Sequence, residues 1–246
     1  MKASAILSLS LLGLASAFPL STREENVVES TSSSVMGGSI SLEQAAAMGR
    51  IEMVNSLESI DAPDDPINEN GLGGACKAVT VLFAKGTGEK GNMGDGSSPG
   101  PAWAAAIRAS LGTDKVTVQG IEYDASVFGY LVGGSPSGTT TYLNTINSAS
   151  TKCPNTKIVI GGYSQGGQIL HNAAEKLTAA VTARIAAVVV FGGPDSKQAV
   201  GSIPASKVLQ VCHTGDIICT GKGGADEHLN YVKDAAMAAA FVVARV

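Results

Sequence analysis

Residues 157–167 read KIVIGGYSQGG, an apolar run followed by the pattern G-x-S-x-G centred on Ser164. The run has the composition of a buried strand, and the residues from Gln165 onward have the period of a helix. A serine in the tight turn between a strand and a helix is pushed out of the backbone, and Gly162 and Gly166 let the two elements close around it. The stretch predicts a nucleophilic serine at the carboxyl end of a strand.

From Cys76 onward, short apolar runs alternate with longer segments of helical period. We expect strands at 78–83, 115–121, 157–161, 186–191 and 207–212, and helices near 101–111, 139–150, 165–177 and 229–244. The strands are nearly continuous apolar runs, as in a sheet whose two faces are both covered by helices. The pattern predicts an α/β fold, a three-layer α/β/α sandwich around a mainly parallel five-stranded sheet, with functional groups at the carboxyl ends of the strands.

The first 70 residues differ in composition from the rest of the chain. Residues 1–17 carry Lys2, an apolar run and a small-residue site, which is the layout of a secretory signal peptide. That run is shorter than the roughly 20 apolar residues that a membrane-spanning helix needs. Residues 18–70 are rich in Ser, Thr and acidic residues, and we expect a leader or pro-segment there. The sequence predicts a secreted protein with one folded domain at 71–246 and no transmembrane segment.

Charge and cysteine content narrow the class further. The chain of 246 residues has 21 acidic and 17 basic residues, which gives no sign of nucleic-acid binding. Four cysteines in a secreted chain indicate two disulfides, for which three pairings are possible. We favour Cys76 with Cys153 and Cys212 with Cys219, because the second pair closes a short loop. The spacings contain neither C-x-x-C nor H-E-x-x-H, so we expect no metal site.

A serine nucleophile needs a base, and the base needs an acid to orient it. His171 lies seven positions after Ser164 on the predicted helix, so its side chain should point away from the turn and pack elsewhere. His213 precedes the best acid candidate, which is the wrong chain order for an α/β-hydrolase. His228 remains, and it fits the order serine, acid, histidine of that fold.

Asp216 is the favoured acid, because it lies just past the last predicted strand, inside the loop between Cys212 and Cys219. Asp195 is its rival, since it also follows a strand, although it is well suited to a turn or a helix cap. The two acids directly before His228 are too close in sequence to reach back to its ring.

Acyl transfer also needs donors for the negative oxygen of the tetrahedral intermediate. One donor should be the backbone N–H of Gln165, the residue after the nucleophile. The second should come from the loop 84–94 after the first strand, where Thr87 offers a backbone N–H and a hydroxyl. The glycines of this loop fit neither a P-loop nor a dinucleotide-binding pattern, so nucleotide binding is disfavoured.

Five motifs occur in a fixed order along the domain. They are FAKGTGE at 83–89, CP at 153–154, GYSQGG at 162–167, C-x-T-G-D-x-x-C at 212–219 and H-L-x-Y at 228–231. Together they resemble the fungal cutinase family. The resemblance implies a compact α/β-hydrolase without a full lid, acting on carboxylic esters including cutin. It also implies that Ser164 is the nucleophile, His228 the base and Asp216 its acid, with Thr87 and Gln165 as the oxyanion hole. The two favoured disulfides are those of the family.

Two departures from the family pattern concern the substrate and its site. Lys85 stands where the family commonly has Arg, and Lys cannot form the same bidentate fork. The segment 223–227 is small and acidic where many cutinases are apolar, which disfavours long-chain substrates. The run 127–132 either adds apolar surface or belongs to the core.

The sequence leaves two alternatives to a cutinase open. One is a short-chain or acetyl esterase that acts on polysaccharide, and the other is a noncatalytic secreted binding protein. We expect the chain to act as a monomer and to need no cofactor.

Overall fold

Five parallel strands form one sheet in the order β2-β1-β3-β4-β5 in a computed structural model that describes residues 67–246. The strands are β1 Val79–Ala84, β2 Val116–Gly120, β3 Lys157–Tyr163, β4 Ile185–Phe191 and β5 Val208–Val211. All four strand pairings are parallel. The five predicted strands are confirmed, each within two residues of its expected ends.

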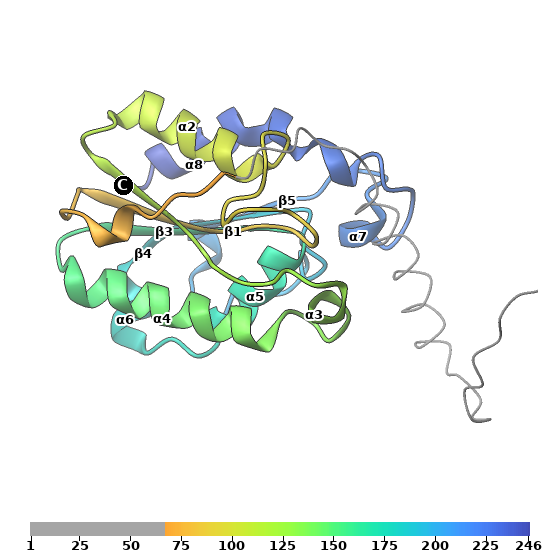
Figure 1. Cartoon of the computed structure of the whole chain (residues 1–246), viewed down its shortest axis with the longest axis horizontal. Helices are drawn as coiled ribbons and strands as arrows, with labels where there is room; N and C mark the ends of the chain where they lie inside the picture. The colour runs from red at the N-terminus through yellow and green to blue at the C-terminus, as the bar shows by residue number, and fades with distance from the viewer. Residues whose placement is uncertain (1–66) are drawn as a thin grey trace, which may run out of the picture. The chain divides into compact units, whose positions relative to one another are not determined.

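Helices cover both faces of the sheet. They are α2 Pro99–Leu111, α3 Val127–Leu131, α4 Pro136–Lys152, α5 Gln165–Ala174, α6 Ala179–Arg184, α7 Ile217–Thr220 and α8 Ala235–Val243, with short 3-10 helices η1 Gly71–Gly73, η2 Ala205–Lys207 and η3 His228–Asp234. Figure 1 shows α2 and α8 on one face and α4, α5 and α6 on the other. The predicted three-layer sandwich is therefore confirmed.

The helix expected at 229–244 is wrong in its first half. That half is the 3-10 helix η3, in which Asn230 has the non-helical angles φ −121° and ψ 26°, and the α-helix begins only at Ala235. The predicted helix at 165–177 also ends early, at Ala174. Three short helices, α3, α6 and α7, were not predicted, because four to six residues are too few to establish a helical period.

Each face of the sheet carries its own apolar core. On the side of α2 and α8, Trp103, Phe191 and Tyr231 are fully buried and lie ring to ring. On the other side, Tyr142 of α4 is fully buried, and its hydroxyl donates to the Gly161 carbonyl at 2.7 Å. The strands β1 and β4 are buried along their whole length, which is the reason that their sequences read as nearly continuous apolar runs.

The turn between β3 and α5 is tight and strained. Ser164 has φ 52° and ψ −118°, a conformation that residues other than glycine rarely adopt. A Cβ on Gly162 would lie 2.4 Å from the Gly166 carbonyl oxygen, and one on Gly166 would lie 2.0 Å from the Ala84 carbonyl oxygen. Both glycines are therefore required by close backbone approach, as the sequence predicted.

We expect Gly166→Ala to lower the free energy of unfolding by about 3 kcal/mol, because the added methyl would collide with the rigid backbone of β1. Chemical denaturation measures the loss. Gly96→Ala is the matched control, since a Cβ there meets no atom within 4 Å, and its effect should stay within about 0.5 kcal/mol. Equal stabilities of the two variants would contradict this account of the turn.

Residues 67–70 are bonded to the folded domain. The Ile67 N–H donates to the Gly94 carbonyl at 2.9 Å, and the Gly120 N–H donates to the Glu69 carbonyl at 2.8 Å. These bonds place Ile67 to Asn70 with the domain rather than with the leader expected at 18–70. The rest of that leader and the signal peptide expected at 1–17 lie outside the described residues. Within residues 67–246, no helix is long and apolar enough to cross a membrane.

Candidate active site

Three polar side chains meet at the carboxyl end of the sheet. Ser164 Oγ lies 3.0 Å from His228 Nε2, and His228 Nδ1 lies 2.9 Å from Asp216 Oδ2. The three residues are 6%, 1% and 0% exposed, respectively. A hydroxyl, an imidazole and a carboxylate in this order form the arrangement that transfers a proton away from the serine during nucleophilic attack.

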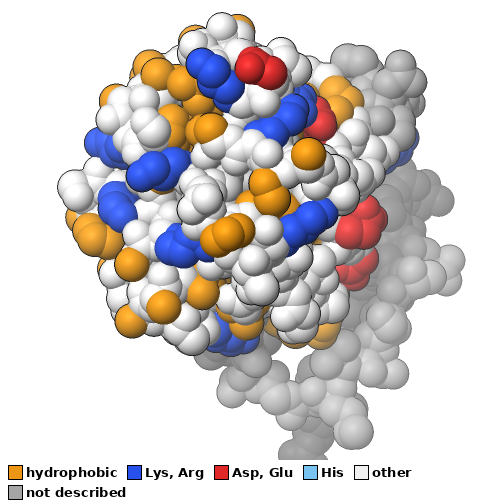
Figure 2. Space-filling view, turned by 90° about the vertical axis from the view of Figure 1, so that its left-hand side faces the viewer, with side chains coloured by type: hydrophobic (Ala, Val, Ile, Leu, Met, Phe, Trp, Pro, Cys, Tyr) orange, Lys and Arg blue, Asp and Glu red, His pale blue; other side chains and the backbone are white. Residues whose placement is uncertain are grey.

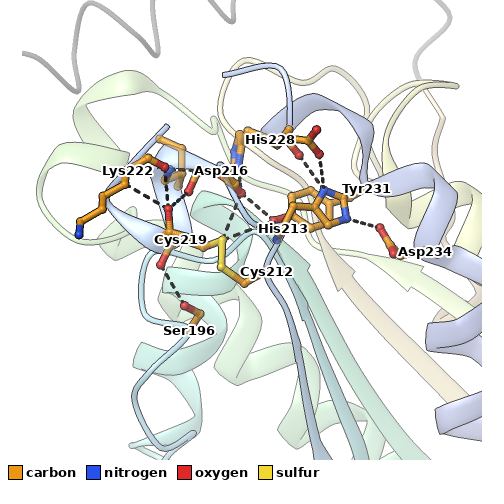
Figure 3. Close-up of a disulfide and its surroundings, with 12 residues drawn as sticks. Ser196, Cys212, His213, Asp216, Cys219, Lys222, His228, Tyr231 and Asp234 are labelled. Atoms are coloured by element: carbon orange, nitrogen blue, oxygen red, sulfur yellow. Dashed lines mark hydrogen bonds and ion pairs between the residues drawn. A yellow bond between two sulfur atoms is a disulfide. The ribbon is translucent and has the colours of Figure 1, made fainter. Parts of the chain in front are cut away.

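The loop that carries Asp216 is fixed from several directions. A disulfide joins Cys212 to Cys219 across its base, as Figure 3 shows, and a second disulfide joins Cys76 to Cys153. Both pairings are the ones favoured from the sequence. Asp216 also caps α7, since its Oδ1 accepts the Ile218 N–H at 2.7 Å. The disulfide and the cap together hold the carboxylate at a defined position beneath the imidazole.

Tyr231 supports the same carboxylate, and sequence reasoning assigned it no role. Its hydroxyl donates to Asp216 Oδ2 at 2.7 Å, and its ring stacks on His213 with centroids 3.9 Å apart (Figure 3). Burial alone would raise the pKa of Asp216, but hydrogen bonds from His228, Tyr231 and the Ile218 N–H outweigh it and hold the pKa below its usual value. Asp216 is therefore ionised at neutral pH.

The other candidates lie apart from Ser164. His213 pairs with Asp234, with Nε2 and Oδ2 2.6 Å apart. His171 is buried, and burial lowers its pKa below the usual histidine value. Asp195 accepts a hydrogen bond from the Gln198 side chain in a turn. The buried position of His171 and the turn position of Asp195 agree with the roles outside the site that the sequence suggested for them, and His213, excluded by chain order, bonds elsewhere.

Thr87 and Gln165 face each other beside the serine. Gln165 is the first residue of α5, so its backbone N–H has no acceptor within the helix. Its side-chain Nε2 donates to the Ser126 carbonyl at 2.9 Å and to Thr87 Oγ1 at 2.8 Å. Because the Thr87 oxygen is the acceptor in this bond, its own hydroxyl proton is available to another partner. The structure thus leaves the Gln165 N–H and the Thr87 hydroxyl proton available as hydrogen-bond donors next to the residue that precedes α5.

Bonds at both ends stabilise the loop that carries Thr87. The Gly88 N–H donates to the carbonyl of Ala125 at 2.9 Å, and Ala125 is held at φ 46°. Lys85 is buried, its Nζ donates to the Gly91 carbonyl at 2.5 Å, and its own carbonyl accepts the Tyr123 hydroxyl at 2.6 Å. Lys85, which stands where the family commonly has Arg, thus supports the loop through one contact of its ammonium group with a carbonyl.

Glu89 closes this loop, since its Oε2 accepts the Gly86 N–H at 2.6 Å. Burial raises the pKa of Glu89 from 4.5 to about 7, although the bond from Gly86 opposes the shift. Between those two values the folded protein keeps a proton that the unfolded chain has lost. Stability contributed by this group is therefore complete below pH 4.5 and is lost as the pH rises through 7.

We expect Glu89→Gln to remove this pH dependence, because the amide stays neutral and still accepts the Gly86 N–H. Relative to the wild type, its free energy of unfolding should rise by about 2 kcal/mol between pH 5 and pH 8. Urea unfolding at the two pH values measures the change. Glu175→Gln, at an exposed site, controls for the loss of one negative charge. A constant difference between Glu89→Gln and wild type would contradict the assignment.

Exposed apolar side chains lie on α3 and directly after it, and Ser126, the N-cap of this helix, accepts the hydrogen bond from Gln165. Phe128 is 70% and Val132 50% exposed, whereas Tyr130 between them is buried and packs with Ile218 of α7. The run 127–132 thus contributes to a small core through one face of α3 and presents apolar surface through the other.

The comparisons with known proteins agree with this geometry. The family model described as Cutinase matches residues 75–246. A cutinase of Blumeria hordei is 55% identical over 205 residues, which cover 82% of this chain and 87% of that protein. A solved Trichoderma reesei cutinase in complex with a C11Y4 phosphonate inhibitor is 40% identical, with a TM-score of 0.66, over 82% of this chain and 89% of that one.

A more distant solved structure, an acetylxylan esterase, is 23% identical with a TM-score of 0.59, over 70% of this chain and 99% of that one. This likeness shows a shared fold only. The matched family model, the high-identity relatives and the fold together lead to one conclusion: the chain belongs to the cutinase family and is a carboxylic ester hydrolase.

Proposed function

We propose that the chain hydrolyses the ester bonds of cutin and related carboxylic esters through an acyl-enzyme on Ser164. The observation that carries the proposal is the hydrogen-bonded row of Ser164, His228 and Asp216 in a chain of the cutinase family. We also propose that the enzyme is secreted, since its two disulfides suit an oxidising compartment.

In the acylation step, Ser164 Oγ attacks the ester carbonyl while His228 Nε2 takes its proton. Asp216 holds the other ring nitrogen, so that Nε2 is free of hydrogen and able to accept. The negative oxygen of the intermediate receives hydrogen bonds from the Gln165 N–H and from Thr87. Collapse of the intermediate breaks the bond to the alcohol, which leaves with the proton from His228.

Deacylation repeats the sequence with water. His228 takes a proton from a water molecule that attacks the acyl carbonyl, and the same two donors stabilise the second intermediate. Its collapse returns the proton to Ser164 Oγ and releases the carboxylic acid.

The surroundings of the site favour a partly apolar substrate of moderate length. Phe128 and Val132 supply exposed apolar surface on one side, while the exposed Asp226 adds a charge on the segment before His228. Apolar surface binds the acyl chain through burial, and a carboxylate at the rim resists a long hydrocarbon. The proposal thus places the preferred soluble esters between acetate and palmitate.

A chain-length profile tests this function. We expect the rate of p-nitrophenyl ester hydrolysis to be highest for butyrate, lower for acetate and palmitate, and accompanied by release of hydroxy fatty acids from cutin. Deacetylation of xylan without any release from cutin would favour the acetyl esterase instead. A failure of a fluorophosphonate probe to label Ser164 would favour a noncatalytic protein.

A further inference from the structure

Positive charge gathers at the end of the sheet opposite Ser164. Each of the five strands has a cation at its first residue or within the two residues before it. These cations are Lys77, Lys115, Lys157, Arg184 and Lys207 for β1, β2, β3, β4 and β5, respectively. Because all the strands are parallel, their starts lie at one edge, which we call the amino edge. Figure 2 shows Lys and Arg side chains spread over this end of the molecule.

The amino edge contains a hollow of about 560 Å³, the basic groove. Four cations line it, namely Lys157, Arg184, Lys207 and Arg245, and its lining includes no acidic side chain. Asn155 and Ser206 add exposed hydrogen-bonding side chains, whereas the Thr156 hydroxyl is buried and bonded to Thr80 Oγ1 at 2.9 Å. The groove therefore combines a concentrated positive charge with neutral polar groups, on a chain whose overall net charge is −4.

Nothing in the described part of the chain neutralises these four charges, since none of them forms an ion pair with a carboxylate there. Arg184 donates to the carbonyls of Cys153 and Thr156 at 2.9 and 3.1 Å, and Lys207 Nζ donates to the Ile185 carbonyl at 2.7 Å.

Arg245 Nε donates to the Ser206 carbonyl at 3.0 Å, and Lys157 is exposed. Carbonyl contacts fix the positions of the guanidinium and ammonium groups but leave their charges uncompensated. The groove therefore holds a positive charge that attracts anions, with the exposed Lys157 free to bond to them.

We propose that the basic groove binds the carboxylate groups of an acidic polysaccharide. The cations match carboxylates, and the amide and hydroxyl groups of the groove match sugar hydroxyls. No aromatic side chain lines the groove, so it lacks the stacking surface that single-stranded nucleic acids use. The exposed large apolar side chains found in the described residues, at 128, 132, 232 and 237, are not part of its lining, so it also lacks the groups that enter a bilayer.

The position of the groove gives this binding a consequence for the enzyme. Lys157 begins β3 and Ser164 follows its last residue, so the seven residues of the strand separate them by about 20 Å. A polysaccharide held at the amino edge leaves the carboxyl end of the sheet uncovered. The groove would therefore anchor the enzyme to an acidic matrix with its ester-cleaving site facing away from the anchor.

Affinity electrophoresis of the full chain in gels containing polygalacturonate tests the proposal. We expect retardation of the wild type at low salt, and binding about tenfold weaker in K157E/K207E. The matched control is K197E, which reverses an exposed charge in the loop after β4 and should bind within twofold of the wild type. Gels with fully methyl-esterified polygalacturonate should not retard the wild type, because the carboxylates are blocked.

Three results would overturn the proposal. They are equal retardation of K157E/K207E and K197E, equal retardation by the methyl-esterified polymer, and tighter binding of phosphatidylserine vesicles or single-stranded DNA than of polygalacturonate. Turnover of p-nitrophenyl butyrate at wild-type rate shows that a variant is folded. If the double variant fails this check, K157E alone decides, since the exposed Lys157 side chain makes no hydrogen bond or ion pair within residues 67–246. Failure of binding leaves the esterase proposal untouched.

Discussion

Replacement of Ser164 by alanine is expected to lower kcat for p-nitrophenyl butyrate by about 10⁶-fold, to the level left by substrate binding and the oxyanion donors. The variant lacks the oxygen that attacks the ester, so no acyl-enzyme forms. Pre-steady-state kinetics should show a burst of p-nitrophenol in the wild type and none in the variant. A fluorophosphonate probe should likewise label only the wild type.

The fold of this variant should be intact, because alanine is smaller than serine and the turn is held by Gly162 and Gly166. A melting temperature close to that of the wild type would show this. Ser110→Ala is the matched control, since Ser110 is an exposed serine near the end of α2 and its loss should leave kcat unchanged. Turnover by Ser164→Ala at more than a few per cent of the wild-type rate would exclude the serine mechanism.

The strands were predictable because their signal is local and strong. Four of the five are mostly buried runs rich in apolar residues, while β5 is only partly buried. Short helices carry no such signal. Residues 217–220 form α7 after the cap at Asp216 and inside the loop closed by the disulfide, but four residues are too few to show a helical period in the sequence.

The site was predictable to the extent that chain order and strand ends constrain it. Chain order separated His228 from His213, whereas Asp216 was favoured over Asp195 for its place in the loop between Cys212 and Cys219. The geometry brings His228 and Asp216 to Ser164. Tyr231 had no comparable signal, because its bond to Asp216 spans fifteen residues and depends on the non-helical start of η3.

The basic groove was missed for a related reason. Each of its four cations lies more than 20 residues from the next one in the sequence, and each alone is an ordinary surface residue. The nearly balanced total charge conceals them as well. Only the parallel order of the strands gathers them at one edge, so topology rather than composition reveals the patch.

Asp216→Asn should lower kcat by about 10⁴-fold while leaving the packing of the loop intact. An amide is nearly the same size as a carboxylate, and its oxygen at the position of Oδ1 can still accept the Ile218 N–H. The NH₂ group then takes the position of Oδ2, to which Tyr231 donates in the wild type. This NH₂ group would also face His228 Nδ1 and donate to it. The imidazole would then carry its proton on Nε2, where it cannot accept the proton of Ser164.

The change of tautomer in Asp216→Asn should also alter the pH dependence of the rate. The rate lost in Asp216→Asn should be partly recovered at alkaline pH, where hydroxide or the ionised serine replaces the base, whereas Ser164→Ala should not recover at any pH. Rates of p-nitrophenyl butyrate hydrolysis between pH 6 and pH 10, corrected for the uncatalysed reaction, measure this. Asp195→Asn is the matched control, because Asp195 lies in a turn away from the imidazole and the same change there should leave the rate within twofold of the wild type. A larger loss in Asp195→Asn than in Asp216→Asn would transfer the role of the acid to Asp195.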